Sequence, residues 1–136
     1  MFVLLCVVLI NGFLGLLIFT RNTRSTVNRL FLLLTFSIYM WAIASYLTDN
    51  APVDQRLWWG RVAFFFPVLV TLCLVLLSRV FPVKLKTSTK ELAGICCVAI
   101  FGMSISLTPL VAKSTITHTN GTDLVPGSMY LVFILI

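Results

Sequence analysis

The side chains that could take part in catalysis or metal binding are few and scattered. His118 is the only histidine. Each of the four acids lies at or beyond the end of an apolar segment: Asp49, Asp54, Glu91 and Asp123. The glycines form neither a G-x-G-x-x-G fingerprint nor a P-loop, the patterns that hold nucleotide phosphates. The four cysteines lie in apolar segments without C-x-x-C spacing, so we read them as small apolar residues: Cys6, Cys73, Cys96 and Cys97. We therefore expect no enzyme activity, cofactor or metal in this chain.

Arg61 is the most informative single residue. It follows Leu57-Trp58-Trp59-Gly60 and lies about one turn inside a long apolar segment. A charge within a membrane costs about 2.5–3.5 kcal/mol at the centre and less near an interface. Its stem could carry the guanidinium to the headgroups, with Asp49 or Asp54 as partner. Alternatively, it faces a cavity for an anionic or carbonyl-bearing ligand, or it locks the second helix to the third.

A stripe of polar residues marks one face of the second apolar segment. Ser37, Trp41, Ser45 and Thr48 recur at steps of four, four and three, which places them on one helical face. A polar stripe in a membrane should face protein, either as helix packing or as part of a ligand pocket. The first segment offers Asn11 beside small residues, which also suits close helix contact.

Composition places the chain in a membrane. Of 136 residues, 60% are hydrophobic and only 10% are charged, against about 25% charged in soluble domains. Apolar segments cover about 2–20, 30–48, 57–81 and 92–111, each near the roughly 20 residues that cross a bilayer. A fifth begins at about 127 and reaches 136, so we expect it to continue beyond this chain. The predicted fold is an all-α polytopic transmembrane bundle, one domain of four full spans and an incomplete fifth.

The bases predict the orientation of this bundle. Most of them flank the connections after the first and third segments: Arg21, Arg24, Arg29, Arg79, Lys84, Lys86 and Lys90. Only Arg56 and Lys113 lie in the other connections, and the positive-inside rule then places the N-terminus and the polar segment 113–127 outside. The net charge of +6 is thus explained by membrane topology, without nucleic acid. Aromatic residues suited to the outer interface are Tyr46, Trp58 and Trp59.

Several of these residues together carry a family resemblance. They are Asn28-Arg29-x-Phe31 at the start of the second helix, Trp41, a short outer turn, Trp59-Gly60-Arg61 and the later TNGTDLVPGSMY. In these features the chain resembles the N-terminal seven-transmembrane sensory domain of bacterial sensor histidine kinases. The resemblance covers nearly the whole chain, although the phosphoacceptor histidine and the ATP-binding domain of such kinases are missing from it.

The resemblance implies a multi-pass receptor of a two-component system in the bacterial inner membrane. A small molecule, a lipid or the state of the envelope would be the stimulus, and a cytoplasmic kinase or other output domain in cis would receive the signal. It also implies a homodimer. Two other interpretations stay open, a small membrane scaffold or subunit of a larger membrane assembly, and a fragment of a transporter.

Overall fold

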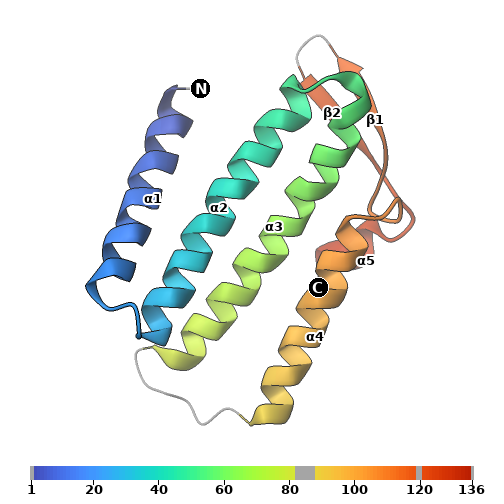
Figure 1. Cartoon of the computed structure of the whole chain (residues 1–136). Coiled ribbons are helices and arrows are strands. Elements are labelled where there is room, and N and C mark those ends of the chain that lie inside the picture. Colours follow the sequence, from blue (N-terminus) through green and yellow to red (C-terminus); the bar gives the residue numbers. More distant parts are fainter. Residues whose placement is uncertain (1, 82–87, 119–120, 136) are drawn as a thin grey trace.

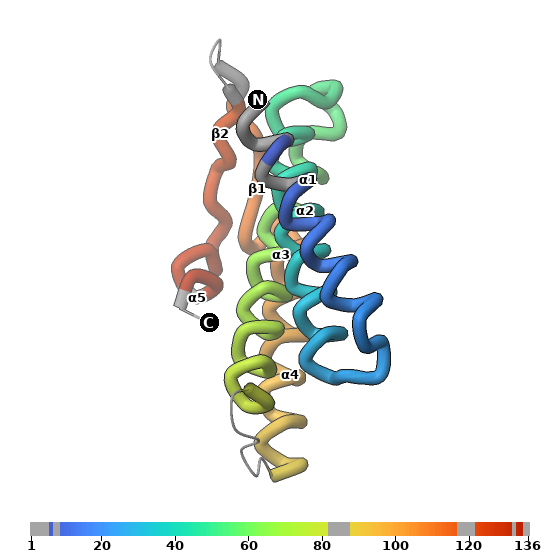
Figure 2. Tube along the Cα trace, turned by 90° about the vertical axis from the view of Figure 1, so that its left-hand side faces the viewer, coloured from blue at the N-terminus to red at the C-terminus, as the bar shows by residue number. Residues whose placement is uncertain are grey.

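The computed structural model describes residues 2–81, 88–118 and 121–135. Its elements follow the chain as α1 (Phe2–Arg21), α2 (Thr26–Asn50), α3 (Val53–Val80), α4 (Thr89–Ser106), β1 (Ala112–His118), β2 (Gly121–Pro126) and α5 (Tyr130–Leu135). The four long helices lie side by side in chain order, and the two strands form a hairpin at one end (Figure 1). Figures 1 and 2 place the short α5 beside α3 and α4, on the side away from α1.

The predicted membrane class is confirmed in its coarse form. The structure is mostly helical, and α2, α3 and α4 are long and apolar enough to cross a bilayer. Helix α1 has 20 residues, and the part of it whose side chains the structure describes without gaps, Leu9–Arg21, is apolar but by itself shorter than a span. Four full spans followed by a fifth therefore stay a prediction.

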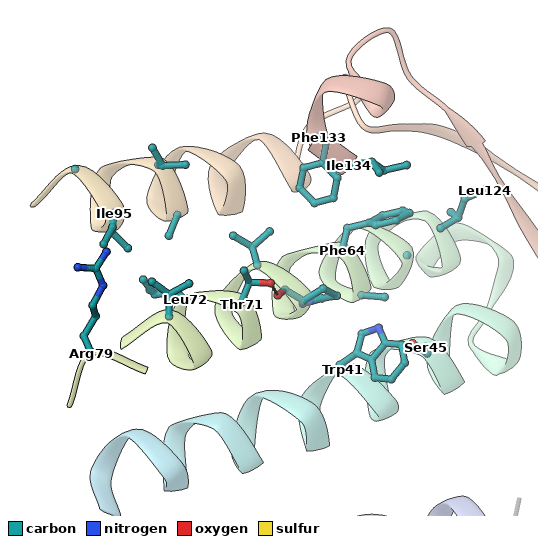
Figure 3. A pocket seen from close by; sticks show the side chains of 18 of the residues that line it. Trp41, Ser45, Phe64, Thr71, Leu72, Arg79, Ile95, Leu124, Phe133 and Ile134 are labelled. Carbon is teal, nitrogen blue, oxygen red and sulfur yellow. Dashed lines mark hydrogen bonds between the residues drawn. The ribbon is translucent and has the colours of Figure 1, made fainter. Parts of the chain in front are cut away.

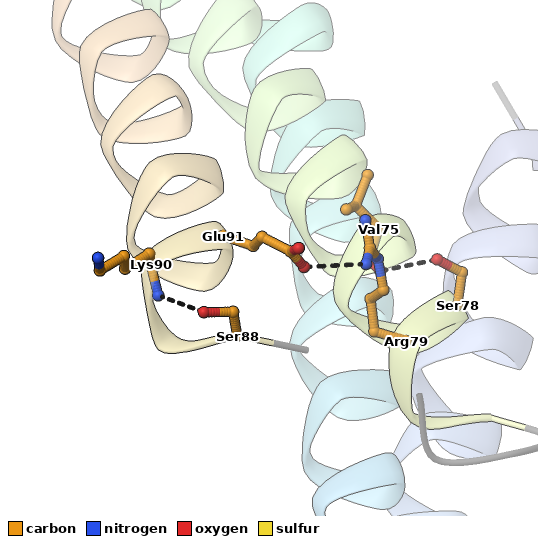
Figure 4. Close-up of polar contacts among 6 residues, drawn as sticks. All are labelled: Val75, Ser78, Arg79, Ser88, Lys90 and Glu91. Atoms are coloured by element: carbon orange, nitrogen blue, oxygen red, sulfur yellow. Dashed lines mark hydrogen bonds and ion pairs between the residues drawn. The ribbon is translucent and has the colours of Figure 1, made fainter. Parts of the chain in front are cut away.

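Capping residues explain why two helices start earlier than predicted. Ser25 is the N-cap of α2, and its hydroxyl accepts a hydrogen bond from the Asn28 amide at 3.4 Å, so this helix begins at Thr26 rather than near 30. The S-x-x-E spacing of Ser88 and Glu91 predicts an N-cap for α4, and Ser88 does accept from the Lys90 amide, so this helix begins at Thr89 although its apolar part begins near 92 (Figure 4). Short polar side chains thus extend both helices beyond their apolar cores.

Prolines explain two further differences in helix bounds. Helix α3 begins at Val53, directly after Pro52, rather than near 57. Helix α4 ends at Ser106 rather than near 111, because Pro109 has no amide hydrogen and disfavours helical geometry in the residue before it. The fifth helix begins at Tyr130 rather than 127.

The hairpin departs from the predicted all-helical class. Strands β1 and β2 pair antiparallel, with Thr115 opposite Leu124 and His118 opposite Gly121, and the register shifts between Ala112 and Ser114. We expected this segment as an external loop. Its β-branched residues favour extended backbone, and an Asn-Gly pair is a strong hairpin signal. The segment therefore forms strands despite its low hydrophobicity.

Charges separate to the two ends of the helices. The end that carries the α1–α2 turn and the start of α4 holds Arg21, Arg24, Arg29, Arg79 and Lys90, and we call it the basic end (Figure 1). Lys84 and Lys86 lie outside the described residues. Arg79 and Glu91 form an ion pair of 3.6 Å between α3 and α4 at this end (Figure 4). Such exposed pairs contribute roughly 0–1 kcal/mol, so the pair orients the helices more than it stabilises them.

Helix α1 contacts α2 through Gly15. A Cβ placed there would collide with the side chain of the buried Thr35. The small residue therefore permits the close approach that the sequence predicted for this helix. Gly12, one turn away, has open space around it.

We expect Gly15→Val to destabilise the contact between α1 and α2 by about 1–3 kcal/mol, the usual cost of overpacking. Equilibrium unfolding in detergent, followed by circular dichroism, measures this change. Gly12→Val is the matched control, because a Cβ added at Gly12 would meet nothing within 4 Å. Equal effects of the two substitutions would mean that helix propensity, and not packing against Thr35, decides the result.

Candidate functional site between the helices and the hairpin

Arg61 fastens the hairpin to α3. Its Nε and Nη2 atoms both donate hydrogen bonds to the carbonyl oxygen of Ala112, at 3.1 and 3.0 Å. Ala112 opens β1 and is fully buried, so Arg61 satisfies a carbonyl that water cannot reach. Arg61 thus bonds a backbone carbonyl of its own chain, a partner that none of the sequence interpretations named, and binding of a ligand stays a prediction. Among the described residues, Asp49 accepts from the Thr122 amide, and neither it nor Asp54 forms an ion pair with Arg61.

The turn between α2 and α3 holds the second strand. An Asp49 carboxylate oxygen accepts a hydrogen bond from the Thr122 amide at 3.0 Å. Arg56 donates through Nη1 to the Thr122 hydroxyl at 3.2 Å and through Nε to the Ala51 carbonyl at 2.8 Å. A single residue of β2 is therefore held from both sides of the helical turn.

Leu124 packs onto α3 where Gly60 leaves room. A Cβ at Gly60 would lie 2.6 Å from Leu124 Cδ2, a distance too short for real contacts. The Leu124 side chain of β2 thus lies directly against the backbone of α3 at Gly60. Together with the polar contacts of Arg61 and Thr122, this makes the hairpin a fixed part of the bundle.

A cavity of about 1060 Å³ lies below this hairpin, between α2, α3, α4 and α5 (Figure 3). We call it the interhelical cavity. Its lining is mainly apolar and comes from four helices and one strand: Trp41, Ser45, Gly60, Ala63, Phe64, Pro67, Val68, Thr71, Leu72, Val75, Arg79, Glu91, Gly94, Ile95, Val98, Ala99, Leu124, Phe133 and Ile134. Pockets for small ligands typically measure about 300–1,000 Å³ and have such apolar walls, so the size suits a ligand.

The interhelical cavity reaches from the hairpin to the basic end. Leu124 and Trp41 line it at one end, and Arg79 and Glu91 line it at the other (Figure 3). From Gly60 to Arg79 the axis of α3 rises about 28 Å at about 1.5 Å per residue. This length approaches the hydrocarbon thickness of a bilayer, about 30 Å.

Aromatic side chains hold α5 against the same cavity. Phe64 of α3 makes edge-to-face contacts with Tyr130 and Phe133, with ring centroids 5.9 and 5.8 Å apart. Such pairs contribute about 0.5–1.5 kcal/mol beyond the burial of their area. Phe64 and Phe133 also line the cavity, so a molecule within it would touch the contact that positions α5.

The predicted polar stripe of α2 divides into two pairs. Trp41 and Ser45 line the interhelical cavity, and Figure 3 shows the indole of Trp41 directed toward α3. Ser37 and Thr48 are buried, and their hydroxyls donate to carbonyls of their own helix, one turn earlier. The stripe thus serves both roles that the sequence left open, a pocket wall and helix packing.

The other predicted site residues lie apart from this cavity. Asn11 is on α1, and neither it nor Arg61 is among the lining residues. Trp41 and Arg61 therefore do not share one pocket, although both belong to the half of the molecule that holds the hairpin. The expected interfacial anchors are near the same end: Tyr46 and Trp58 are exposed, and Trp59 is partly buried.

Sequence reasoning missed Phe64, Thr122 and Leu124. Phe64 lies among other apolar residues, and nothing in its neighbourhood distinguishes it. Thr122 and Leu124 alternate along β2, in a segment for which the sequence analysis predicts a loop. Gly60 precedes Arg61 in the sequence, and its lack of a side chain is what admits Leu124.

No protein-family model matches the chain, and neither a curated protein nor a solved structure is significantly similar to it. The class that the fold defines is therefore a mostly helical membrane protein with at least three helices able to span a bilayer.

Proposed function

We propose that this chain is the transmembrane sensory module of a bacterial signal-transduction protein of the histidine-kinase type. In this proposal the N-terminus and the hairpin face outward, four helices span the inner membrane, and α5 is the start of a fifth span. A kinase or other output domain of the same protein receives the signal in the cytoplasm, and two copies act as a dimer. The separation of charge between the two ends of the helices supports this orientation.

The interhelical cavity is the observation that carries the proposal. It contacts every helix except α1, and it joins the hairpin to the Arg79–Glu91 ion pair at the basic end. A ligand shifts a conformational equilibrium only when it binds two packings with different affinity. An occupant of this cavity would touch α2, α3, α4 and α5 together, so its affinity would depend on how they pack.

The lining indicates the chemistry of the stimulus. Most of the cavity wall is aliphatic or aromatic, and its polar groups are few. The Thr71 hydroxyl already donates to the Pro67 carbonyl at 2.9 Å, which leaves the Trp41 indole and Ser45 as polar contacts near the hairpin. An elongated apolar molecule, such as a lipid or another membrane-soluble compound, fits this wall best.

Trp41→Ala tests this function in the intact protein. The substitution removes from the cavity wall a large side chain that also carries a polar indole N–H. We therefore expect the stimulus-dependent change in kinase output to fall at least about tenfold, equivalent to roughly 1.4 kcal/mol. Autophosphorylation in membranes, with and without stimulus, measures it. Trp41→Phe keeps an aromatic wall and should retain most of the response. An unchanged response in Trp41→Ala would refute a sensory role for this cavity.

A transport function has weaker support. Transporters often use broken helices and ionisable groups near the membrane midplane. Pro67 lines the cavity, but α3 is continuous from Val53 to Val80, and the charged residues of the lining lie at the basic end. The open reading frame that encodes this chain separates the two candidates. A kinase domain in the same frame would favour the sensory function, and a second transporter half would favour transport.

A further inference from the structure

We propose that the flank of α1 and α2 at the basic end binds an anionic phospholipid. The phosphate would contact Arg29, and one acyl chain would lie in the apolar groove beside it. This site is separate from the interhelical cavity and does not depend on the sensory function.

The groove has a volume of about 640 Å³ and a mixed lining of Phe19, Thr23, Arg29, Leu32, Leu33 and Phe36. The α2 residues recur at steps of three, one and three, which places them on one face of the helix. From Arg29 to Phe36 the helix rises about 10 Å, so the groove leads from the charged turn into the depth of the hydrocarbon. Leu33 and Phe36 are exposed, and their side chains can take up an acyl chain.

Arg29 is held in place before any lipid arrives. Its Nε donates to the Thr23 carbonyl at 2.8 Å. The neighbouring Asn28 donates through Nδ2 to the carbonyls of Ile18 and Asn22, at 2.8 and 3.2 Å, and so fixes the turn between the helices. The Nη atoms of a guanidinium can then bond two phosphate oxygens, a geometry that arginine favours. Asn28 thus fixes the turn, and Arg29 beside it lines the groove.

Charge at this turn favours an anion. Arg21 and Arg24 lie beside Arg29 in the sequence, and all three are exposed. The four acids of the chain are placed elsewhere: Asp49, Asp54 and Asp123 lie toward the hairpin, and Glu91 pairs with Arg79. Basic pockets between membrane helices bind acidic lipid headgroups. A free anion would match the charge but would leave the apolar groove unfilled, whereas a phospholipid matches both parts.

Native mass spectrometry of the purified full chain tests this proposal. The chain is offered equal amounts of phosphatidylglycerol and phosphatidylcholine with identical acyl chains. We expect the anionic lipid to be retained preferentially, and Arg29→Gln to reduce that preference about tenfold, because a charge-assisted contact is lost. Arg29→Lys keeps the charge and should keep part of the preference.

Two further variants separate the groove from general attraction. Arg24→Gln removes the same charge from the same turn but outside the groove lining, so it should lower the lipid preference much less than Arg29→Gln does. Leu33→Trp should fill the groove and lower retention of both lipids. Equal retention of the two lipids by the wild type would overturn the proposal. So would an equal loss in Arg24→Gln and Arg29→Gln, or a chain that retains neither lipid, whether it is a monomer or a dimer.

Discussion

Replacing Arg61 by alanine should release the hairpin from α3. The Ala112 carbonyl would lose both of its Arg61 donors while its residue is fully buried. An unsatisfied buried acceptor costs about 1–3 kcal/mol. Amide hydrogens of β1 and β2 should therefore exchange roughly 5- to 150-fold faster, which hydrogen-exchange mass spectrometry of the hairpin peptides measures.

Two variants control this experiment. Lys113→Ala removes an exposed base next to Ala112 in the sequence and should leave exchange unchanged. Arg61→Lys keeps a charge but loses the fork of donors, so it should give an intermediate rate. If Arg61→Ala exchanged like the wild type, the contacts of Asp49, Thr122 and Leu124 would be sufficient to hold the hairpin.

Release of the hairpin from α3 should also change the wall of the interhelical cavity. Leu124 lines that cavity and packs on Gly60, so a detached β2 would remove part of the wall. Arg61 itself does not line the cavity. Arg61 therefore positions the hairpin that forms part of the proposed sensory site, but it would not itself contact a ligand there.

The sequence predicted the membrane class and the approximate helices because long apolar segments depend on local composition. Helix ends were less predictable, since they depend on single residues such as Ser25 and Pro109 that apolar segments do not reveal. Both carry a readable local signal, an N-cap and a helix stop. The boundaries could thus have been improved from the same sequence by giving such residues more weight.

The site could be predicted only in part. The spacing of Trp41 and Ser45 indicated a shared face, and both line the cavity. The partner of Arg61 could not be inferred, because a contact between a helix and a backbone carbonyl 51 residues later leaves no pattern in the sequence. The cavity itself depends on how α3, α4 and α5 are spaced, and this spacing results from packing and not from local composition.

Gly127→Ala should destabilise the protein more than an alanine substitution at Gly12, Gly15, Gly60 or Gly94. A Cβ at this position would collide with the backbone carbonyl of Leu110 and with that of Pro109. Unlike the tip of a flexible side chain, these backbone carbonyls cannot rotate away from the added methyl group. The Gly127 amide also donates to the Val111 carbonyl at 2.8 Å, so residue 127 cannot move away without losing that bond.

The cost follows from where this contact lies. Gly127 closes the base of the hairpin, and the next turn places Tyr130 against Phe64. A shift there would separate β2, α5 and α3 together, so we expect a loss of about 1–3 kcal/mol in the free energy of unfolding. Equilibrium unfolding in detergent measures it, and hydrogen exchange of residues 127–130 locates it.

Gly94→Ala is the matched control for this substitution. It adds the same methyl group in α4, where nothing lies within 4 Å, and it should stabilise the helix by up to about 1 kcal/mol. Opposite signs for the two variants would show that the approach of Gly127 to the backbone of residues 109–110 holds the hairpin base. If Gly127→Ala unfolded like the wild type, the base could relax around a methyl group, and α5 would be positioned by its aromatic contacts with Phe64 instead.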